Sequence, residues 1–341
     1  MSQSIMSRAL FCRSCLHQAA GVGKQIRPFS STLSSPRAVV PSFKPTDSKD
    51  LDEILTKFRE HVFIPAFLSR PRRKLLYKTP IESSPLLQQP ITIYLENSET
   101  YQLRPLRLED TPRNSKLRDV VELMTTPEHW SNLLPLLQGM HSAKRTPKVD
   151  VMEFILRKAG EAGMNTLMME CAKQSRTTGL SLGNYQIAEL FFSNFRMQAE
   201  KADFKGPELE KALKNAKQTA TLMNMPGHAP VDRLADPRRN PNIIDVLLEL
   251  SAARALDAFE GKDTTGDVVS YAEKLIGTWQ LREFKIPEYS KGAKRELTEL
   301  PSVGIEFALQ VEEVQANEKL SGELRKKLEE LDARAKAEAS S

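Results

Sequence analysis

Ten basic residues between positions 70 and 118 are of the types that bind phosphate groups. They fall in two groups, and the first has five positive charges in nine residues, with no acidic residue from 70 to 78. Lysine and arginine side chains that neutralise phosphates release condensed counterions, which gives affinity for nucleic acid without any reading of bases. The sequence therefore predicts an RNA-binding surface formed by Arg70, Arg72, Arg73, Lys74, Lys78, Arg104, Arg107, Arg113, Lys116 and Arg118. A basic linker that only aids solubility is the alternative interpretation.

Recognisable catalytic and metal-binding patterns are absent from the sequence. The five histidines lie outside any ligand spacing such as H-E-x-x-H, so each is expected at the surface or at a helix end. No G-x-S-x-G elbow, Walker A loop or dinucleotide-binding glycine pattern is present. Cys171 shares an apolar helical stripe with Met168 and Met169, which predicts a packed core thiol. We therefore expect a protein that is not an enzyme and binds no metal, cofactor or small-molecule substrate.

The N-terminal segment has the composition of a mitochondrial transit peptide. Residues 1–46 contain no Asp or Glu but six Lys and Arg together with many serines, a composition typical of matrix targeting. The sequence Arg27-Pro28-Phe29-Ser30 is similar to the cleavage pattern of the matrix protease. We therefore expect residues 1–29 to be removed, together with Cys12 and Cys15, and the mature protein to lie in the mitochondrial matrix. A disordered basic tail is the alternative.

Hydropathy and charge limit the function further. No run of about 18 apolar residues occurs, which argues against a membrane span. The net charge of +5 is unevenly distributed: residues 30–118 hold 15 Lys and Arg against 10 Asp and Glu, whereas residues 119–341 hold 30 against 34. The mature chain is thus expected to combine a cationic arm with a slightly acidic body.

The first basic group lies in a proline-rich region, residues 30–114, that we expect to form the arm. Ten of the 21 prolines fall between Pro36 and Pro112, so most of this region is expected to be irregular and able to extend along RNA. One helix is predicted inside it, capped by Ser48 and continuing to about Val62. Alternating apolar residues over 90–95 and 100–104 predict a β-hairpin, which must dock on something larger because an isolated hairpin is marginally stable.

From Ser115 onward the apolar spacing is helical. Thr126-Pro127 and Asn240-Pro241 have the cap and first-turn proline of helix starts, and Pro135 is expected to kink or split a helix. The predicted helices cover about 150–162, 165–178, 184–201, 207–224, 241–256, 266–284 and 305–338. We expect a helical-repeat-like domain over 115–225, a linker over 226–241 and a C-terminal helical region over 242–341. The predicted fold class is mainly α, an α-solenoid-like bundle of helical hairpins with a basic arm and a small β-hairpin.

Two of the predicted helical hairpins begin 34 residues apart, the period of tetratricopeptide-type repeats. The junction Thr178-Gly179-Leu180-Ser181-Leu182-Gly183-Asn184-Tyr185 resembles the boundary between two pentatricopeptide repeats, and the resemblance covers about residues 149–224. In that family, polar residues early in each repeat read one nucleotide each. The residues that follow Tyr185 are Gln186, Ile187 and Ala188, which depart from this pattern. A generic antiparallel helical bundle is the alternative.

A matrix protein with a basic proline-rich arm, a small hairpin, a helical body and no catalytic pattern resembles the mitochondrial ribosomal proteins of fungi, and in layout those of the large subunit. The resemblance implies a structural protein whose partners are mitochondrial rRNA and neighbouring ribosomal proteins, and which supports mitochondrial translation. The alternatives are a pentatricopeptide-like RNA-binding factor in transcript processing or translation activation, and a scaffold for an inner-membrane complex.

Overall fold

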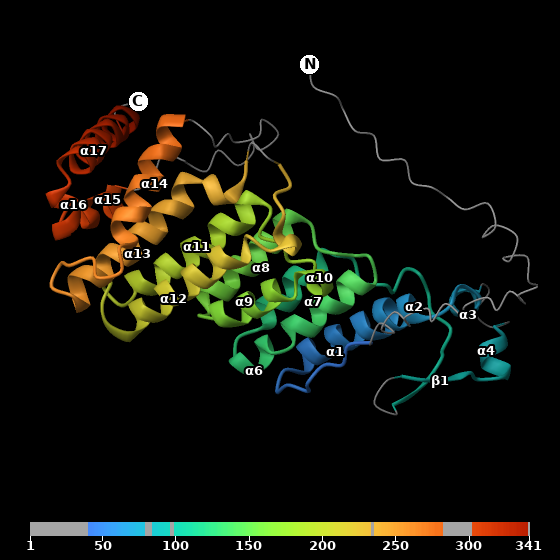
Figure 1. The fold of residues 1–341 in the computed structure, drawn as a ribbon. Helices are drawn as coiled ribbons and strands as arrows, with labels where there is room; N and C mark the ends of the chain where they lie inside the picture. The colour runs from blue at the N-terminus through green and yellow to red at the C-terminus, as the bar shows by residue number, and fades with distance from the viewer. Residues whose placement is uncertain (1–39, 79–83, 96–98, 233–234, 282–301, 340–341) are drawn as a thin grey trace, which may run out of the picture. The chain divides into compact units, whose positions relative to one another are not determined.

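The computed structural model describes residues 40–78, 84–95, 99–232, 235–281 and 302–339, so the predicted transit peptide lies outside the described residues. The chain divides into two units, Met1–Ala38 and Val39–Ser341. The second unit contains all of the elements described below and is mainly helical (Figure 1). Among the described residues its one sheet is a two-stranded antiparallel hairpin, which confirms the predicted fold class.

The described elements fall into three consecutive groups along the chain. The first group is α1 (Lys49–Phe58), the π-helical segment η2 (Arg59–Phe63), α2 (Ile64–Phe67), α3 (Arg70–Leu76), α4 (Pro85–Gln88), β1 (Thr92–Tyr94) and β2 (Thr100–Gln102). The central group is α5 (Lys116–Leu123), α6 (Pro127–Trp130), α7 (Leu133–Ser142), α8 (Val149–Glu161), α9 (Asn165–Lys173), α10 (Ser175–Thr178), α11 (Tyr185–Glu200) and α12 (Gly206–Leu222). The last group is η5 (Pro226–His228), η6 (Pro237–Arg239), α13 (Pro241–Ala258), α14 (Asp267–Leu281), α15 (Ser302–Ala308), α16 (Glu312–Ala316) and α17 (Glu318–Ala339).

The first predicted helix, expected to continue to about Val62, runs on past Pro65. Ser48 caps α1 as predicted, with its side chain accepting from the Leu51 N–H, but the helix runs on through η2 into α2. Pro65 has no N–H for the carbonyl four residues before it, and its ring would clash with that carbonyl. The wider π-helical turn immediately before α2, in which the Ile64 N–H bonds to the Arg59 carbonyl, accommodates the proline without breaking the helix.

The hairpin has the predicted position and one buried face. Ile93 lies opposite Tyr101, and Tyr94 lies opposite Thr100. The buried residues next to and within the strands are Ile93, Leu95 and Leu103. They belong to the same hydrophobic cluster as α1, α5 and α7, so the hairpin is docked on the helical body, as its marginal intrinsic stability requires.

Several helices begin at the residues where the sequence predicted N-terminal caps. The Thr126 side chain accepts from the His129 N–H at the start of α6, and Asn240 accepts from the Asn242 N–H at the start of α13. Pro135 neither kinks nor ends a helix, because it lies in the first turn of α7, where an N–H has no intrahelical partner. The split that we expected there occurs instead before α7, between Trp130 and Leu133.

Helices α8, α9, α11 and α12 form two packed pairs. Helix α8 packs on α9 and α11 on α12, while α11 also packs on α8 and α12 on α9, as stacked helical hairpins do. The starts of α8 and α11 are Val149 and Tyr185, a slightly longer period than the expected 34 residues.

Helix α13 joins two hydrophobic clusters. It packs on α11 and α12 on one side and on α14 and α15 on the other, and it is buried at every position from Ile243 to Ala253. Ile243, Val246 and Leu250 belong to the larger cluster, whereas Ile244 and Leu248 belong to the smaller one with the C-terminal helices. The regions predicted on either side of the linker at 226–241 thus meet along this helix, and their division into domains stays a prediction.

Two predictions of local structure were wrong. The segment Arg70–Leu76 was expected to be extended, but it forms α3, with Pro71 in its first turn where a missing N–H costs nothing. The single helix expected over 305–338 is three helices, α15, α16 and α17. Their apolar residues, including Ile305, Val311 and Leu324, are fully buried against α13 and α14, so this region is part of the core.

Candidate nucleic-acid interface

All ten predicted phosphate-binding residues are exposed, but helix formation redistributes the first group. At about 100° per residue, Arg70, Arg73 and Lys74 share one side of α3, while Arg72 lies on another. Leu76 is the buried residue of this helix and attaches it to the core. The charges on α3 therefore surround a helix that is anchored to the core, whereas the sequence predicts that they lie along an extended segment.

Arg73 has a structural role. Its Nε donates to the Pro65 carbonyl at 2.8 Å, and its terminal nitrogen donates to the Ala66 and Leu68 carbonyls at 3.0 and 3.2 Å. These carbonyls lie at the C-terminal end of α2, where backbone acceptors lack helical partners and the helix dipole favours a cation. Arg73 thus caps α2 and is the least available of the ten residues for a phosphate.

Two residues of the second group are paired with acids. Lys116 contacts Asp119 at 2.6 Å, and Arg118 contacts Asp150 at 3.2 Å while its guanidinium lies 5.5 Å from the centre of the Phe154 ring. Exposed ion pairs of this kind are weak, but they lower the net positive charge that α5 presents.

The remaining cations form a set that we name the α3–hairpin basic surface. The backbone brings its two parts together, because the Leu106 N–H donates to the Leu76 carbonyl at 2.8 Å and so joins the segment after β2 to the end of α3. Within the described ranges, no hydrogen bond or ion pair engages its six side chains. The α3–hairpin basic surface consists of Arg70, Arg72, Lys74, Lys78, Arg104 and Arg107.

Among the described residues, few acidic groups oppose this surface. Glu99, the residue before β2, forms an ion pair with Arg59 at 2.5 Å. Glu109 and Asp110 are exposed and follow Arg107 in the chain. Arg113 is also exposed, and its segment is held elsewhere, because Arg145 donates to the Pro112 carbonyl at 2.8 Å. The surface therefore keeps a net positive charge at the α3 and β1 end of the unit (Figure 1).

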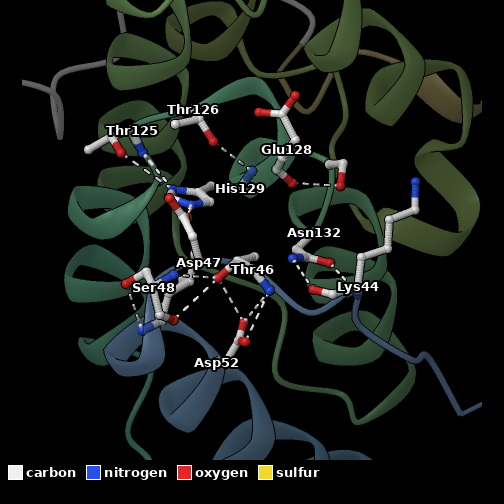
Figure 2. Close-up of polar contacts among 12 residues, drawn as sticks. Lys44, Thr46, Asp47, Ser48, Asp52, Thr125, Thr126, Glu128, His129 and Asn132 are labelled. Atoms are coloured by element: carbon white, nitrogen blue, oxygen red, sulfur yellow. Dashed lines mark hydrogen bonds and ion pairs between the residues drawn. The ribbon is translucent and has the colours of Figure 1, made fainter.

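A second polar cluster ties the segment before α1 to helices α6 and α7 (Figure 2). The Asn132 amide is fully buried and forms two hydrogen bonds with the backbone of Lys44, accepting from its N–H at 2.8 Å and donating to its carbonyl at 2.9 Å. Thr46 is held in turn by Asp52, whose carboxylate accepts from the Thr46 N–H and hydroxyl. These contacts fix the start of the described chain to the helical body.

His129 completes this cluster: it lies at the end of α6, one of the two places expected for the histidines, but it is not at the surface. It is buried, and its Nδ1 accepts from the Thr125 N–H at 3.3 Å, which assigns the proton to Nε2, the nitrogen that contacts Asp47. This hydrogen bond holds the pKa of Asp47 below its ordinary value. His228 is also buried, accepts from the Leu182 N–H at 3.0 Å, and has a pKa lowered by burial.

Replacing Asn132 by alanine should loosen the segment that it holds. Both hydrogen bonds to Lys44 are lost, and we expect the free energy of unfolding to fall by about 1–3 kcal/mol. Hydrogen exchange of the amides over 40–48 should accelerate more than that of α8. Asn132→Asp is the matched control, because its side chain still accepts from the Lys44 N–H and should protect that amide more than alanine does. Unchanged exchange over 40–48 in Asn132→Ala would contradict the anchoring role.

Helix α13 carries two buried carboxyl groups that face Arg196. Glu249 is almost fully buried and accepts from the Arg196 Nε at 2.8 and 3.2 Å. Burial raises the pKa of Glu249, although Arg196 opposes the shift. Asp245 lies one turn earlier against Gly304, where a Cβ would collide with its carboxyl group. Burial and the proximity of Glu249 raise the pKa of Asp245 well above its ordinary value.

The described residues offer no candidate catalytic or metal centre. No group of three His, Cys, Asp or Glu in the described ranges could hold a metal ion. Cys171 is a packed core thiol, as predicted, and burial raises its pKa to about 12, so it carries no reactive thiolate. An open pocket of about 300 Å³ is lined by residues of α5, α6 and α8 with the exposed pair Lys158 and Glu161. One lining residue, Thr125, places its hydroxyl 3.4 Å from the His129 Nδ1, a nitrogen that already accepts from the Thr125 N–H.

The pentatricopeptide-like region places its early helix residues away from solvent. At the start of α11, Gln186 is partly exposed, but Ile187 and Ala188 are buried. Side chains in the core cannot form hydrogen bonds with a base edge, so these two residues do not read nucleotides.

No helix among the described residues is long and apolar enough to cross a membrane. In comparisons with known proteins, the family model described as mitochondrial ribosomal protein mS27 matches residues 27–341. The chain is also similar to the small ribosomal subunit protein mS27 of Neurospora crassa, with 27% identity over 313 residues that cover 83% of this chain and 76% of the relative.

Proposed function

The chain belongs to the family of mitochondrial ribosomal protein mS27, and from this premise we propose that it is a structural component of the small mitochondrial ribosomal subunit. In this proposal the α3–hairpin basic surface binds rRNA phosphates, and the helical body contacts neighbouring ribosomal proteins. Membership of a ribosomal protein family confirms that the protein is not an enzyme and that it lies in the mitochondrial matrix.

The expectation of a large-subunit protein is wrong. The relative from Neurospora crassa is named as a small-subunit protein, and it shares the designation mS27 with the matching family. The layout that suggested the large subunit, a basic region next to a helical body, does not distinguish one subunit from the other. The error therefore lies in the use of layout, and the broader assignment to mitochondrial ribosomal proteins is unaffected.

The observation that carries the rRNA proposal is the cation set on α3 and after β2. Six exposed Lys and Arg side chains have no hydrogen bond or ion pair with any described residue, although the other described cations of the predicted set are used in capping or in pairs with acids, Arg113 excepted. Uncompensated cations on one surface attract a polyanion and gain affinity by counterion release. Lys116 and Arg118 are secondary candidates, because a phosphate must compete with Asp119 and Asp150.

We also propose that residues 1–29 act as the import signal. The family match begins at residue 27, close to the predicted cut after Phe29, which supports a shared mature region preceded by a separate targeting segment. Sequencing of the N-terminus of the mature protein would test this boundary.

A pentatricopeptide-like RNA-processing factor is the weaker alternative. The stacked pairs α8/α9 and α11/α12 favour a repeat-like body, but the burial of Ile187 and Ala188 argues against base reading. Crosslinking and sequencing separates the two functions. Bound reads confined to small-subunit rRNA support the ribosomal role, and reads concentrated on a few messenger leaders would contradict it.

The triple variant Arg70→Gln, Arg72→Gln, Lys74→Gln tests the rRNA contact. We expect weaker binding to small-subunit rRNA and a slope of log K against log salt that is shallower by about 2–3, since each phosphate contact contributes about 0.7–0.9. The measurement is RNA binding over a salt series, together with co-sedimentation with the small subunit on sucrose gradients.

A matched triple variant provides the control. Lys319→Gln, Arg325→Gln, Lys326→Gln removes the same charge from exposed positions of α17 and should leave the slope unchanged. Equal effects of the two triple variants would mean that only net charge matters, and an unchanged slope in the α3 variant would remove this helix from the interface.

A further inference from the structure

The outer face of the hairpin presents an aromatic ring to solvent. Tyr94 is 79% exposed, the largest exposure among the exposed large apolar side chains of the described residues. Its cross-strand partner is Thr100, and the next pair on the same face is Thr92 with Gln102. These short polar neighbours leave the ring of Tyr94 uncovered, so the fold gains little from it.

The opposite face of the hairpin holds this ring in place. Ile93 and Leu103 are 3% and 1% exposed and pack into the main hydrophobic cluster. The pairing extends beyond both strands, since the Leu103 N–H donates to the Ile91 carbonyl at 2.9 Å and the Leu95 N–H to the Glu99 carbonyl at 2.8 Å. Tyr94 thus projects from an anchored strand, and little backbone freedom would be lost when a partner binds it.

A cation of the α3–hairpin basic surface lies on the same face. Side chains alternate along a strand, so Thr100 and Gln102 point the same way; Arg104 follows β2 by two residues, is exposed, and continues this alternation in sequence. Thr100 lies opposite Tyr94, which places Arg104 about 13 Å further along the hairpin at about 3.3 Å per residue. An aromatic ring and a cation separated in this way match a base and a backbone phosphate of one extended strand.

We propose that Tyr94 stacks on an unpaired base of rRNA while Arg104 binds a phosphate further along the same strand. The proposal rests on the proposed rRNA-binding function and specifies its partner as single-stranded RNA. A-form duplexes keep their bases stacked inside, whereas loops and bulges can turn a base outward onto an aromatic side chain. The positive charge of the α3–hairpin basic surface favours RNA over a neighbouring protein as the occupant, because cations without an acidic partner among the described residues attract an anionic partner.

Binding of the full chain to a labelled, unstructured oligoribonucleotide and to the duplex formed with its complement tests this role. Tyr94→Ala should weaken single-strand binding by roughly 5- to 150-fold, the range for one base stacked on an aromatic ring, and leave the salt slope unchanged. Tyr94→Phe should keep the affinity. Arg104→Gln should instead make the salt slope shallower by about 0.7.

The controls distinguish this inference from the proposed function. Thr92→Ala, on the same exposed face, should have no effect on either RNA. Full affinity of Tyr94→Ala for the single strand, while the α3 triple variant binds weakly, would overturn the stacking and leave the phosphate contacts standing. Equal losses for single strand and duplex would also overturn it. Absence of RNA binding by the unmodified chain would instead contradict the proposed function.

Crosslinking inside the assembled subunit tests the alternative occupant. A photo-reactive amino acid in place of Tyr94 should form an adduct with rRNA, and the adduct should map to an unpaired nucleotide. An adduct with a ribosomal protein, or with a base-paired segment, would overturn the proposal.

Discussion

Arg196→Met should lower the free energy of unfolding by about 3–5 kcal/mol. Arg196 is the one cation shown in contact with Glu249 among the described residues, and the Glu249 side chain is 1% exposed. Removing one partner of a buried ion pair leaves the other charge without compensation, and this costs far more than the pair itself contributes. Asp245, which is also buried on α13, intensifies the effect, because the two acids repel each other when both are ionised.

Chemical denaturation of three variants checks this prediction. Arg196→Met with Glu249→Met should recover most of the lost stability, since apolar residues often replace a buried pair without cost. Lys57→Met is the matched control: Lys57 contacts Glu53 at 2.6 Å, but both side chains are more than half exposed, so the loss should stay below about 1 kcal/mol. A loss in Arg196→Met as small as in Lys57→Met would show that Glu249 is not held ionised by Arg196.

Phe195→Ala should be comparably destabilising, by about 3–5 kcal/mol. Phe195 is fully buried on α11, and its ring meets Phe191 at 6.3 Å and Phe192 at 6.0 Å, both edge to face. Truncation removes these contacts and leaves a cavity where α11 packs on α8, α12 and α13, helices that cannot all move to fill it.

The chain offers a control of the same chemistry. Tyr94→Ala removes an aromatic ring from an exposed position and should change the free energy of unfolding by less than about 0.5 kcal/mol. Denaturation curves of the two alanine variants therefore separate burial from aromatic character. A large loss in Tyr94→Ala would mean that the hairpin depends on this ring and would weaken its assignment to RNA.

The helical part of the fold was predictable because its signals are local. A cap or a first-turn proline acts within a few residues, so Thr126, Asn240 and Pro241 marked helix starts that the structure contains. The apolar spacing likewise indicated α8, α11 and α12 to within about two residues. The alternation of apolar and polar residues was likewise sufficient to predict strands β1 and β2.

Features that depend on distant partners were not predictable. The continuation of α1 past Pro65 depends on a widened turn, and proline alone predicts an end. The C-terminal stripe that includes Val311 and Leu324 could have faced solvent, a partner or the core, and the fact that it packs on α13 depends on residues about 60 positions away. The ring nitrogen of buried His129 has its partner in Asp47, 82 residues earlier in the chain.

The sequence predicted which residues belong to the candidate site but not how they are arranged in space. All ten residues are exposed, as cations usually are. The sequence could not show that Arg73 caps α2 or that Arg118 meets Asp150, because both contacts depend on the fold. Nor did the charge pattern indicate Tyr94, although its position in an alternating strand, with apolar Ile93 and Leu95 on either side, is the signal that would have placed it on the outer face.

The position of helix α13 also bears on the order in which parts of the chain can pack together. Its two sides are covered from opposite directions along the chain, by α11 and α12 before it and by α14 to α17 after it. Ile244 and Leu248 share their cluster with residues of α14 to α17, so a chain that emerges from its N-terminus first covers them last. A chain that ends before α15 is therefore expected to leave these apolar residues of α13 partly exposed.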